Sequence, residues 1–571
     1  MNRLWFRSIA LGLVFAQAIA FASVCRAIDS APGERLLPKD TLLFFSIADV
    51  PEFGKQWEKS SMGQLLRDPQ MAPFLEDVHR KIDEASGEME KEVGVSIKDL
   101  TELPQGEVTF AMFETPARKL GFVLLLEYGS QQATIDKLLK KMDEALEKEE
   151  AEHATEEFER VNIHVYTLKN PEPDNPFKTI TYFADKSFLV FSNDKDALKS
   201  VLERWEGDSE EVLAQNNEYK YIQSQCSGDR ADSLIKWYLN PFGLIQTGIT
   251  AAQATFPQAG LAGAFLPMFG VNTLTGWGGS VNFEDSDLAG VASTYIYTGE
   301  KPTGLLGLFQ FPAAQLVPPN WVPADIGSYS AGNWNVNEAY RSIETLVDQF
   351  QGRGATARFL DSVAEKGPMI HPKKDLLDHL DGKIHILQSE TKESEDDDGA
   401  PTPMILAGFG LKDAGKMKKT LAAAVKAGDS NIESREFNGE IIYEISPPNS
   451  DQPVSIAITE GQLVVTNDTP LLEGMMRGQA SRTTLVDSAD YKQVSKHFPA
   501  KASMISFQRT EAQFKTYYNM LKNSDNVLEG IDVSKLPPFE VIAKYFPPSG
   551  GYTVPDARGA KSVTFSLKQA D

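Results

Sequence analysis

Cysteine is almost absent from the sequence: 571 residues contain only Cys25 and Cys226. Cys25 lies in an N-terminal segment that we expect to be removed, so Cys226 cannot form an internal disulfide. The fold therefore has to rest on its apolar core rather than on covalent cross-links. With 42% apolar residues and this length, the chain is expected to form two or more domains.

The familiar catalytic motifs are also missing. The sequence contains no Gly-x-Ser-x-Gly elbow, no His-Glu-x-x-His helix and no Cys-x-x-Cys pair. The stretch GFGLKDAG, which begins at Gly408, lacks the Lys-Ser/Thr ending of a phosphate-binding loop and the third glycine of a dinucleotide fingerprint. It indicates a strand end followed by a turn. The sequence therefore predicts no catalytic, cofactor-binding or metal-binding residue, and no cofactor.

Long apolar runs are confined to the N-terminus. Arg3 and Arg7 precede an apolar stretch from Ile9 to Val24, and Cys25, Arg26 and Ala27 follow. This order is typical of a secretory signal peptide, residues 1–27, cut after Ala27. Val24 and Arg26 on either side of Cys25 disfavour a lipid-anchored variant. No later segment reaches the length of a membrane-spanning helix, so we expect a soluble, secreted or periplasmic protein.

Positive charge is in deficit. The chain carries 56 Lys and Arg against 80 Asp and Glu, a formal net charge of −24, and loss of the leader also removes three arginines. Such an acidic protein repels phosphate backbones and anionic lipids. Nucleic acid is therefore not an expected partner.

The sequence does contain an internal repeat. FLVFSNDKDALKSVL at 188–202 matches QLVVTNDTPLLEGMM at 462–476, and further matches flank them in the same order. Among these matches are pairs of identical residues: Asp99 with Asp375, Gly106 with Gly382, Tyr219 with Tyr491, Gly278 with Gly550, and Gly279 with Gly551. We interpret the chain as an internal duplication. The predicted domains are 34–300 and 318–571, joined by a Pro-containing linker, 301–317.

Each copy has the pattern of an α+β domain. Strand-like runs alternate with amphipathic helical segments, and hairpins are expected around Asp185-Lys186 and Glu460-Gly461. The predicted fold is two tandem homologous domains, each a mostly antiparallel sheet with helices packed on one face.

The repeated Asn-Asp pair stands between a strand and a helix in both copies. Asn193, Asp194, Asn467 and Asp468 occupy positions where a side-chain oxygen can accept hydrogen bonds from the first turn of a helix. No base or nucleophile accompanies them. We therefore predict an architectural role as helix caps.

The order of these features resembles a known family. A signal peptide, LLPKDT before a strand, GQLLRDPQMAPFLE in a helix, and the closing YFPPSGGYTVPDARG are similar to an uncharacterised family of exported bacterial proteins, known only as a domain of unknown function. The resemblance implies export and a duplicated fold. It implies no reaction, cofactor or binding residue.

Two clusters suggest metal binding at first sight. His371, His379 and His385 fit no zinc-ligand spacing, and we expect independent surface or strand histidines. The acidic run Glu390 to Pro403 lacks the ligand spacing of a calcium loop. It is expected to be a mobile, metal-free loop inserted in the second copy.

One segment differs between the copies. Residues 243–270 are apolar and rich in Ala and Gly, whereas the counterpart around Tyr517 to Phe539 is charged. Pro257 interrupts the segment, so it does not predict a membrane span. It either packs against the other domain or closes the core, or it forms an exposed surface for a protein partner, a membrane or an apolar ligand.

The sequence leaves two functions open. The first is a non-enzymatic interaction or scaffold protein of the cell envelope, acting through a protein or apolar ligand that contacts 243–270. The alternative is a hydrolase or a hydrophobic-ligand carrier with a site in the inter-domain cleft.

Overall fold

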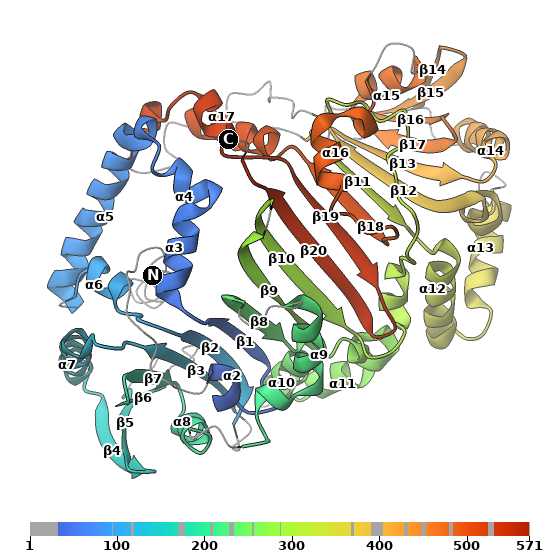
Figure 1. Cartoon of the computed structure of the whole chain (residues 1–571). Coiled ribbons are helices and arrows are strands. Elements are labelled where there is room, and N and C mark those ends of the chain that lie inside the picture. The colour runs from blue at the N-terminus through green and yellow to red at the C-terminus, as the bar shows by residue number, and fades with distance from the viewer. Residues whose placement is uncertain are drawn as a thin grey trace. The chain divides into compact units, whose positions relative to one another are not determined.

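The computed structural model (Figure 1) describes residues 32–569, except 94, 116–118, 170–177, 206–208, 228–232, 254–255, 286, 367–369, 390–402, 428–431, 447–452, 479–482 and 524–529. The expected signal peptide, residues 1–27, and the acidic run from Glu390, apart from Pro403, lie outside these residues.

The chain divides into two compact units. The first unit runs to Gly263 and adds Leu274–Tyr297 and the described part of Asn526–Pro538. The second unit comprises Ala264–Thr273, Thr298–Asp525 and Phe539–Asp571, as far as these are described. Each unit therefore includes a short segment that is flanked in the sequence by residues of the other unit.

The first unit is built on an antiparallel sheet. Its strands are β1 (Leu43–Ile47), β2 (Val108–Glu114), β3 (Leu120–Glu127), β4 (Glu152–Phe158), β5 (Val161–Thr167), β6 (Thr179–Asp185), β7 (Phe188–Ser192), β8 (Ile235–Leu239), β9 (Gly276–Asp285) and β10 (Leu288–Tyr297). They pair in the order β4-β5-β6-β7-β3-β2-β1-β8-β9-β10.

The second unit has the same kind of sheet. Its strands are β11 (Ser328–Asn333), β12 (Leu380–Gln388), β13 (Ile405–Leu411), β14 (Ile432–Phe437), β15 (Glu440–Ile445), β16 (Val454–Thr459), β17 (Gln462–Thr466), β18 (Met504–Gln508), β19 (Ser549–Pro555) and β20 (Gly559–Leu567). They pair antiparallel in the order β14-β15-β16-β17-β13-β12-β11-β18-β19-β20. This order corresponds strand for strand to that of the first unit.

Helices connect these strands. Those of the first unit are α2 (Gly33–Leu36), α3 (Val50–Lys59), α4 (Ser61–Leu65), η2 (Pro69–Met71), α5 (Ala72–Val93), α6 (Ile97–Glu102), α7 (Gln132–Lys148), α8 (Lys195–Leu202), η3 (Leu213–Gln215), α9 (Asn217–Cys226), α10 (Pro241–Gln253) and η11 (Val533–Lys535). Helix α11 (Ala259–Phe265) crosses the boundary at Gly263.

The helices of the second unit are η4 (Leu266–Phe269), η5 (Val271–Thr273), η6 (Gly304–Phe309), α12 (Val336–Gln351), α13 (Ala355–Lys366), the π turn η7 (Pro372–Leu376), η8 (Leu377–His379), α14 (Ala414–Ala427), α15 (Thr469–Met476), η10 (Leu485–Asp487), α16 (Ala489–Ser495), α17 (Thr510–Asn523) and α18 (Phe539–Ala543).

The core of the first unit lies on both faces of its sheet. Val123 and Leu125 of β3 pack in one buried cluster with residues of α8 and α9. Leu126, the next residue along, packs in a second cluster with Ile135 of α7. Successive side chains of a strand point to opposite faces, so the two clusters cover opposite sides. The expectation of helices on one face is therefore wrong for this unit, because its central strands are apolar on both sides and each side needs a cover.

Residues 301–317, expected as a linker, are packed into the second unit. They include η6, where Leu308 O accepts a hydrogen bond from Trp334 Nε1 at 2.8 Å. Ala314 and Ala502 exchange two backbone hydrogen bonds of 2.9 Å. This stretch is part of the second unit rather than a free connection, because its backbone groups pair with Trp334 and Ala502 of that unit.

Candidate functional site

The apolar stretch 243–270 forms α10, α11, η4 and part of the turns around them. In α10, all of whose residues the structure describes, no side chain is buried. Phe256 and Leu261 are each 65% exposed. This exposure contradicts the expectation that the described residues up to Gly263 close the core.

The corresponding helix of the second unit has a different surface. Helix α17 follows β18 as α10 follows β8, but it carries Glu511, Lys515 and Lys522, whereas α10 has no charged residue. A helix at this position in the fold can therefore carry charged residues, as α17 does. The fold itself does not require the uncharged surface of α10.

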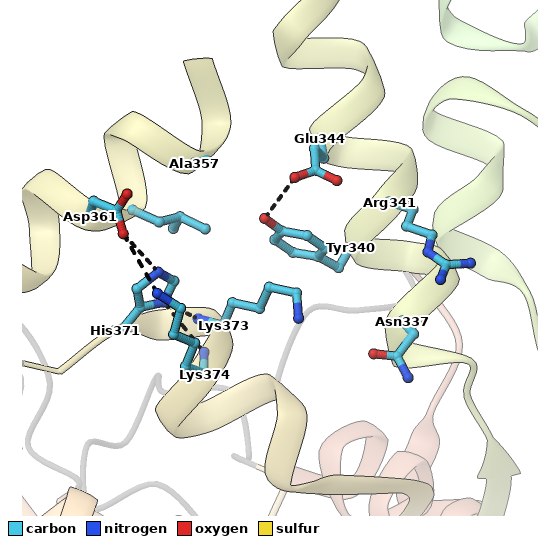
Figure 2. Close-up of a pocket in the computed structure, with 10 residues that line it drawn as sticks. Asn337, Tyr340, Arg341, Glu344, Ala357, Asp361, His371, Lys373 and Lys374 are labelled. Carbon is cyan, nitrogen blue, oxygen red and sulfur yellow. Dashed lines mark hydrogen bonds and ion pairs between the residues drawn. The ribbon is translucent and has the colours of Figure 1, made fainter. Parts of the chain in front are cut away.

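The second unit also contains a polar pocket of about 330 Å³ (Figure 2). Helices α12 and α13 and the π turn η7 form its walls. The residues that line it are Asn337, Tyr340, Arg341, Glu344, Ala357, Leu360, Asp361, His371, Lys373 and Lys374. Its size is at the lower end of the range for small-molecule sites.

The cations of this pocket are paired with carboxylates. Lys373 Nζ lies 2.9 and 3.1 Å from the two oxygens of Asp378. Lys374 Nζ lies 3.8 Å from Asp361 Oδ1. A ligand would meet a mixed, nearly balanced set of charges rather than a positive cradle, so the pocket has no strong preference for anions.

Tyr340 is not activated for chemistry. Its hydroxyl donates to Glu344 Oε1 at 3.2 Å, and the Lys373 ammonium lies 5.2 Å from the centre of its ring. Burial and the neighbouring Glu344 carboxylate raise the pKa of Tyr340 to about 12. The phenol therefore stays protonated at neutral pH and cannot serve as a base or nucleophile.

His371 acts as a helix cap in this pocket. Its Nδ1 accepts hydrogen bonds from the backbone N–H groups of Lys373 (3.2 Å) and Lys374 (3.3 Å), so the ring proton is on Nε2. Nε2 faces Asp361 Oδ1 at 3.4 Å, as Figure 2 shows. The His371 backbone N–H donates to Asp375 Oδ2 at 2.7 Å. Both ring nitrogens are engaged, so His371 is not placed to take a proton from a substrate.

The first unit has a similar cap. Ser96 Oγ accepts from the Asp99 N–H at 3.0 Å, and the Ser96 N–H donates to Asp99 Oδ2 at 2.9 Å, at the start of α6. This reciprocal pair is a capping box. His371 and Asp375 take the same two roles in the second unit, which gives His371 a structural explanation.

His379 and His385, the other two histidines of the sequence cluster, are not among the residues that line the pocket. His379 ends η8. His385 is buried in β12, where its Nδ1 lies 2.9 Å from the Tyr329 hydroxyl. Among the described residues, no group of three or more His, Cys, Asp or Glu is arranged to hold a metal ion.

The Asn-Asp pairs have a structural role, and the two residues of each pair make different hydrogen bonds. Asp194 accepts from the Asp196 N–H at 2.8 Å at the start of α8, and Asp468 accepts from the Leu471 N–H at 3.0 Å at the start of α15. These two are the caps that the sequence predicts.

The asparagines do not cap, contrary to the prediction. Asn193 accepts from the Phe122 N–H and donates to Leu120 O, both at 3.1 Å, and so extends the pairing of β3 with β7 by one step. Asn467 does the same for β13, accepting from the Ile405 N–H at 2.7 Å. A side-chain amide carries both a donor and an acceptor, as a peptide group does, so it can continue a strand ladder.

Sequence reasoning missed a buried carboxylate in the first unit. Glu107 Oε1 accepts hydrogen bonds from the Gly33 N–H (3.0 Å), Ser46 Oγ (2.9 Å) and Thr109 Oγ1 (2.5 Å). Burial raises the pKa of Glu107, although these hydrogen bonds oppose the shift. The acidic residue before the apolar run VTFAMF was the only signal in the sequence, since two of its partners, Gly33 and Ser46, are remote.

One smaller expectation is confirmed. The stretch GFGLKDAG holds the end of β13 and a short turn, after which Asp413 accepts from the Lys416 N–H at 2.9 Å in the first turn of α14. Cys226 is buried in α9, with its sulfur 4.0 Å from Gly278 O.

In the part of the chain that the structure describes, no helix has the length and apolar character needed to cross a membrane. No protein-family model, curated protein or solved structure matches this chain.

Proposed function

We propose that this chain is an exported, non-enzymatic interaction protein of the cell envelope, built from two copies of one α+β domain. Export rests on the signal-peptide pattern of residues 1–27. The interaction role rests on one observation above all, the exposed and uncharged surface of α10 and the turn into α11.

Three kinds of match support the duplication. The strands of the two units pair in the same order, and the Asn-Asp devices occupy the same place in it. The matched glycines also have the same use: a Cβ on Gly278 would lie 3.0 Å from Ile222 of α9, and one on Gly550 would meet Val494 of α16. A helix packs closely on the sheet at both glycines, as a common ancestor of the two copies would require.

A hydrolase or a hydrophobic-ligand carrier is the alternative. The pocket of α12, α13 and η7 is the main candidate for it, but His371 uses both ring nitrogens for structure and Tyr340 keeps its proton. A polar lining also suits a hydrophobic cargo poorly. The apolar surface therefore carries the proposal and the pocket does not.

Affinity capture from a detergent-solubilised cell-envelope extract tests the proposal. The mature chain is compared with Leu261→Asp and with the control Phe359→Asp, which alters an equally exposed phenylalanine on α13. We expect Leu261→Asp to keep the melting temperature, because the side chain is solvent-exposed, and to lose the captured components. Capture that is unchanged in Leu261→Asp would rule out this surface.

The enzymatic alternative has its own test. The mature chain is screened against model esters, phosphate esters, glycosides and peptides, alongside the variants Asp361→Asn and His371→Ser. We expect no turnover above the buffer rate. Turnover that both variants abolish without loss of folding would support the alternative instead.

A further inference from the structure

The segment that contains α10 lies in an unusually long uncharged run. From Trp237 to Phe283 the chain has no Asp, Glu, Lys, Arg or His, and the run is bounded by Lys236 and Glu284. Charged residues make up 24% of the whole chain, so a gap of this length is a strong departure from its composition.

Exposure of the apolar side chains increases with distance from the sheet. Near the start of α10, Gly243 lies against Leu42, and Asn240 Oδ1 accepts from the Gly243 N–H at 2.8 Å. Further along, Ile245 is 38% exposed, and Phe256 and Leu261 are the most exposed members of the set. The start of α10 is thus anchored, whereas Phe256 and Leu261, in the middle of the run, present large apolar side chains to water. This exposure is unfavourable unless something covers them.

Small residues hold α10 and α11 together. A Cβ on Gly263 would lie 3.7 Å from Ile249 Cγ2, and one on Gly260 would meet the Gln253 side chain. The described residues 241–253 and 256–263 thus place α10 and α11 against each other, and we call these residues the apolar hairpin. With 13 residues, α10 is about 20 Å long, shorter than the ~30 Å hydrocarbon core of a bilayer. The hairpin is suited to enter one leaflet and not to span both.

Charge decides which kind of partner fits. A protein partner tolerates and commonly uses charged residues at the rim of its interface, whereas hydrocarbon penalises a charge at every inserted position. The run from 237 to 283 itself contributes no charged residue to the surface or to its rim. Its polar residues near the tip are neutral, such as Gln253 and Gln258.

We propose that the apolar hairpin inserts into one leaflet of a lipid bilayer whose surface is zwitterionic, and so anchors the protein peripherally. The inference rests on the proposed function and names the partner class of the same surface. The hairpin lacks the Lys and Arg that draw basic amphipathic helices to anionic lipids, and the chain as a whole is strongly acidic. Binding must therefore come from apolar burial, and anionic lipid should weaken it.

Flotation with protein-free phosphatidylcholine vesicles tests the inference. The mature chain should float with the vesicles. Phe256→Asp and Leu261→Asp should each lower the partition coefficient about tenfold or more, since a carboxylate is costly in the acyl region. Phe359→Asp, a change at equal exposure on α13, should float like the parent chain.

Lipid charge and salt provide a second readout. Replacing a third of the phosphatidylcholine by phosphatidylglycerol should weaken binding, and high salt should remove the difference by screening. An environment-sensitive dye on Leu261→Cys should shift to the blue on addition of vesicles, and the same dye on Phe359→Cys should not. Cys226 is buried and contributes little labelling.

The outcomes separate the inference from the proposed function. If the parent chain does not float, or if Phe256→Asp and Leu261→Asp float equally well, the hairpin does not insert into lipid. Should Leu261→Asp nevertheless lose components in the envelope capture, the partner is a protein and the interaction function stands. Binding that is stronger with phosphatidylglycerol and lost in salt would also overturn the inference, because it would be electrostatic.

Discussion

At the scale of the residue, His385 is held neutral by its surroundings. It is 4% exposed in β12, its Nδ1 lies 2.9 Å from the Tyr329 hydroxyl, and its ring meets Trp321 edge to face at 5.6 Å. Burial lowers the pKa of His385 to about 4; Asp381 opposes the shift and Lys383 adds to it, both less strongly. The ring therefore accepts a proton in the unfolded chain at a higher pH than in the folded one.

This difference predicts acid sensitivity. An unfolded histidine titrates near 6.5, so between pH 6.5 and about 4 the unfolded state binds more protons and the free energy of unfolding falls as pH falls. The loss from this one group is up to about 3 kcal/mol. Urea titrations at pH 7 and pH 4.5 measure it: His385→Gln should lose less stability than the parent over this interval, and the exposed control His79→Gln should behave as the parent. Equal losses in His385→Gln and the parent would contradict the argument.

The other histidines show what residue types alone can predict. The spacing of His371, His379 and His385 predicted independent histidines, and His385 does lie in a strand, β12. It could not show that His371 caps η7, because serine does that work in the first copy and histidine is an unusual cap. Local sequence patterns therefore identify common helix caps such as Ser96 and miss unusual ones such as His371.

At the scale of the element, the hairpins were predicted to within one residue. The β6–β7 turn consists of Lys186 and Ser187, not Asp185 and Lys186, because Asp185 pairs with Phe188. In the β16–β17 hairpin Glu460 and Gly461 form the turn, as expected. Both turns have positive φ at both positions, 47° and 70° in the first and 52° and 71° in the second. This is the type I′ geometry that favours glycine at its second position.

Introducing glycine at one turn and removing it from the other should therefore change the free energy of unfolding in opposite directions. Ser187→Gly should raise the free energy of unfolding by about 1 kcal/mol, and Gly461→Ser should lower it by about the same amount, because a side chain disfavours positive φ. A Cβ on Gly461 would meet nothing within 4 Å, so the change reports on backbone conformation alone. Urea unfolding provides the measurement. Gly87→Ala in α5, also free of contacts, is the control and should stabilise; a loss on Ser187→Gly would refute the explanation.

Sheet coverage was the element-scale feature that the sequence analysis misjudged. The runs GFVLLLE in β3 and FLVFS in β7 are apolar at successive positions, which is the pattern of strands covered on both faces. Strict alternation would have favoured one covered face. The signal was present in these two strands, but the expectation of a mostly antiparallel α+β domain outweighed it.

At the scale of the whole molecule, strand order could be anticipated from the repeat, but the exchange of segments between units could not. Residues 530–538 belong to the first unit, although they stand far along the chain. Arg80 donates to Gly530 O at 3.0 Å, and Asp77 of α5 accepts from the Asp532 N–H at 3.2 Å. No periodicity or motif connects a helix in residues 72–93 with a segment several hundred residues later, so only coordinates reveal this contact.

Asp77 is the residue that fastens this remote segment. Besides the Asp532 amide it meets Lys535 Nζ at 2.9 Å, and this contact, followed by the amide hydrogen bond, lowers the pKa of Asp77. Asp77→Ala removes both interactions with the segment, whereas Asp77→Asn keeps an acceptor for the amide. Both variants also lose the ion pair of Asp77 with Arg80, at 3.4 Å. In the full-length mature chain, hydrogen exchange at the Asp532 and Lys535 amides should therefore be fastest in Asp77→Ala and intermediate in Asp77→Asn.

The exposed pair Lys55 and Glu52 on α3 supplies the matched control, since Lys55→Ala also breaks an ion pair but fastens no remote segment. Hydrogen exchange at η11 in Lys55→Ala should equal that in the parent chain. If Asp77→Ala leaves η11 exchange unchanged, the segment is held by its apolar residues, such as Leu536, and not by the carboxylate. If exchange rises equally in Asp77→Ala and Asp77→Asn, the ion pair dominates over the amide hydrogen bond. Either result would locate the interaction that keeps residues 530–538 in the first unit.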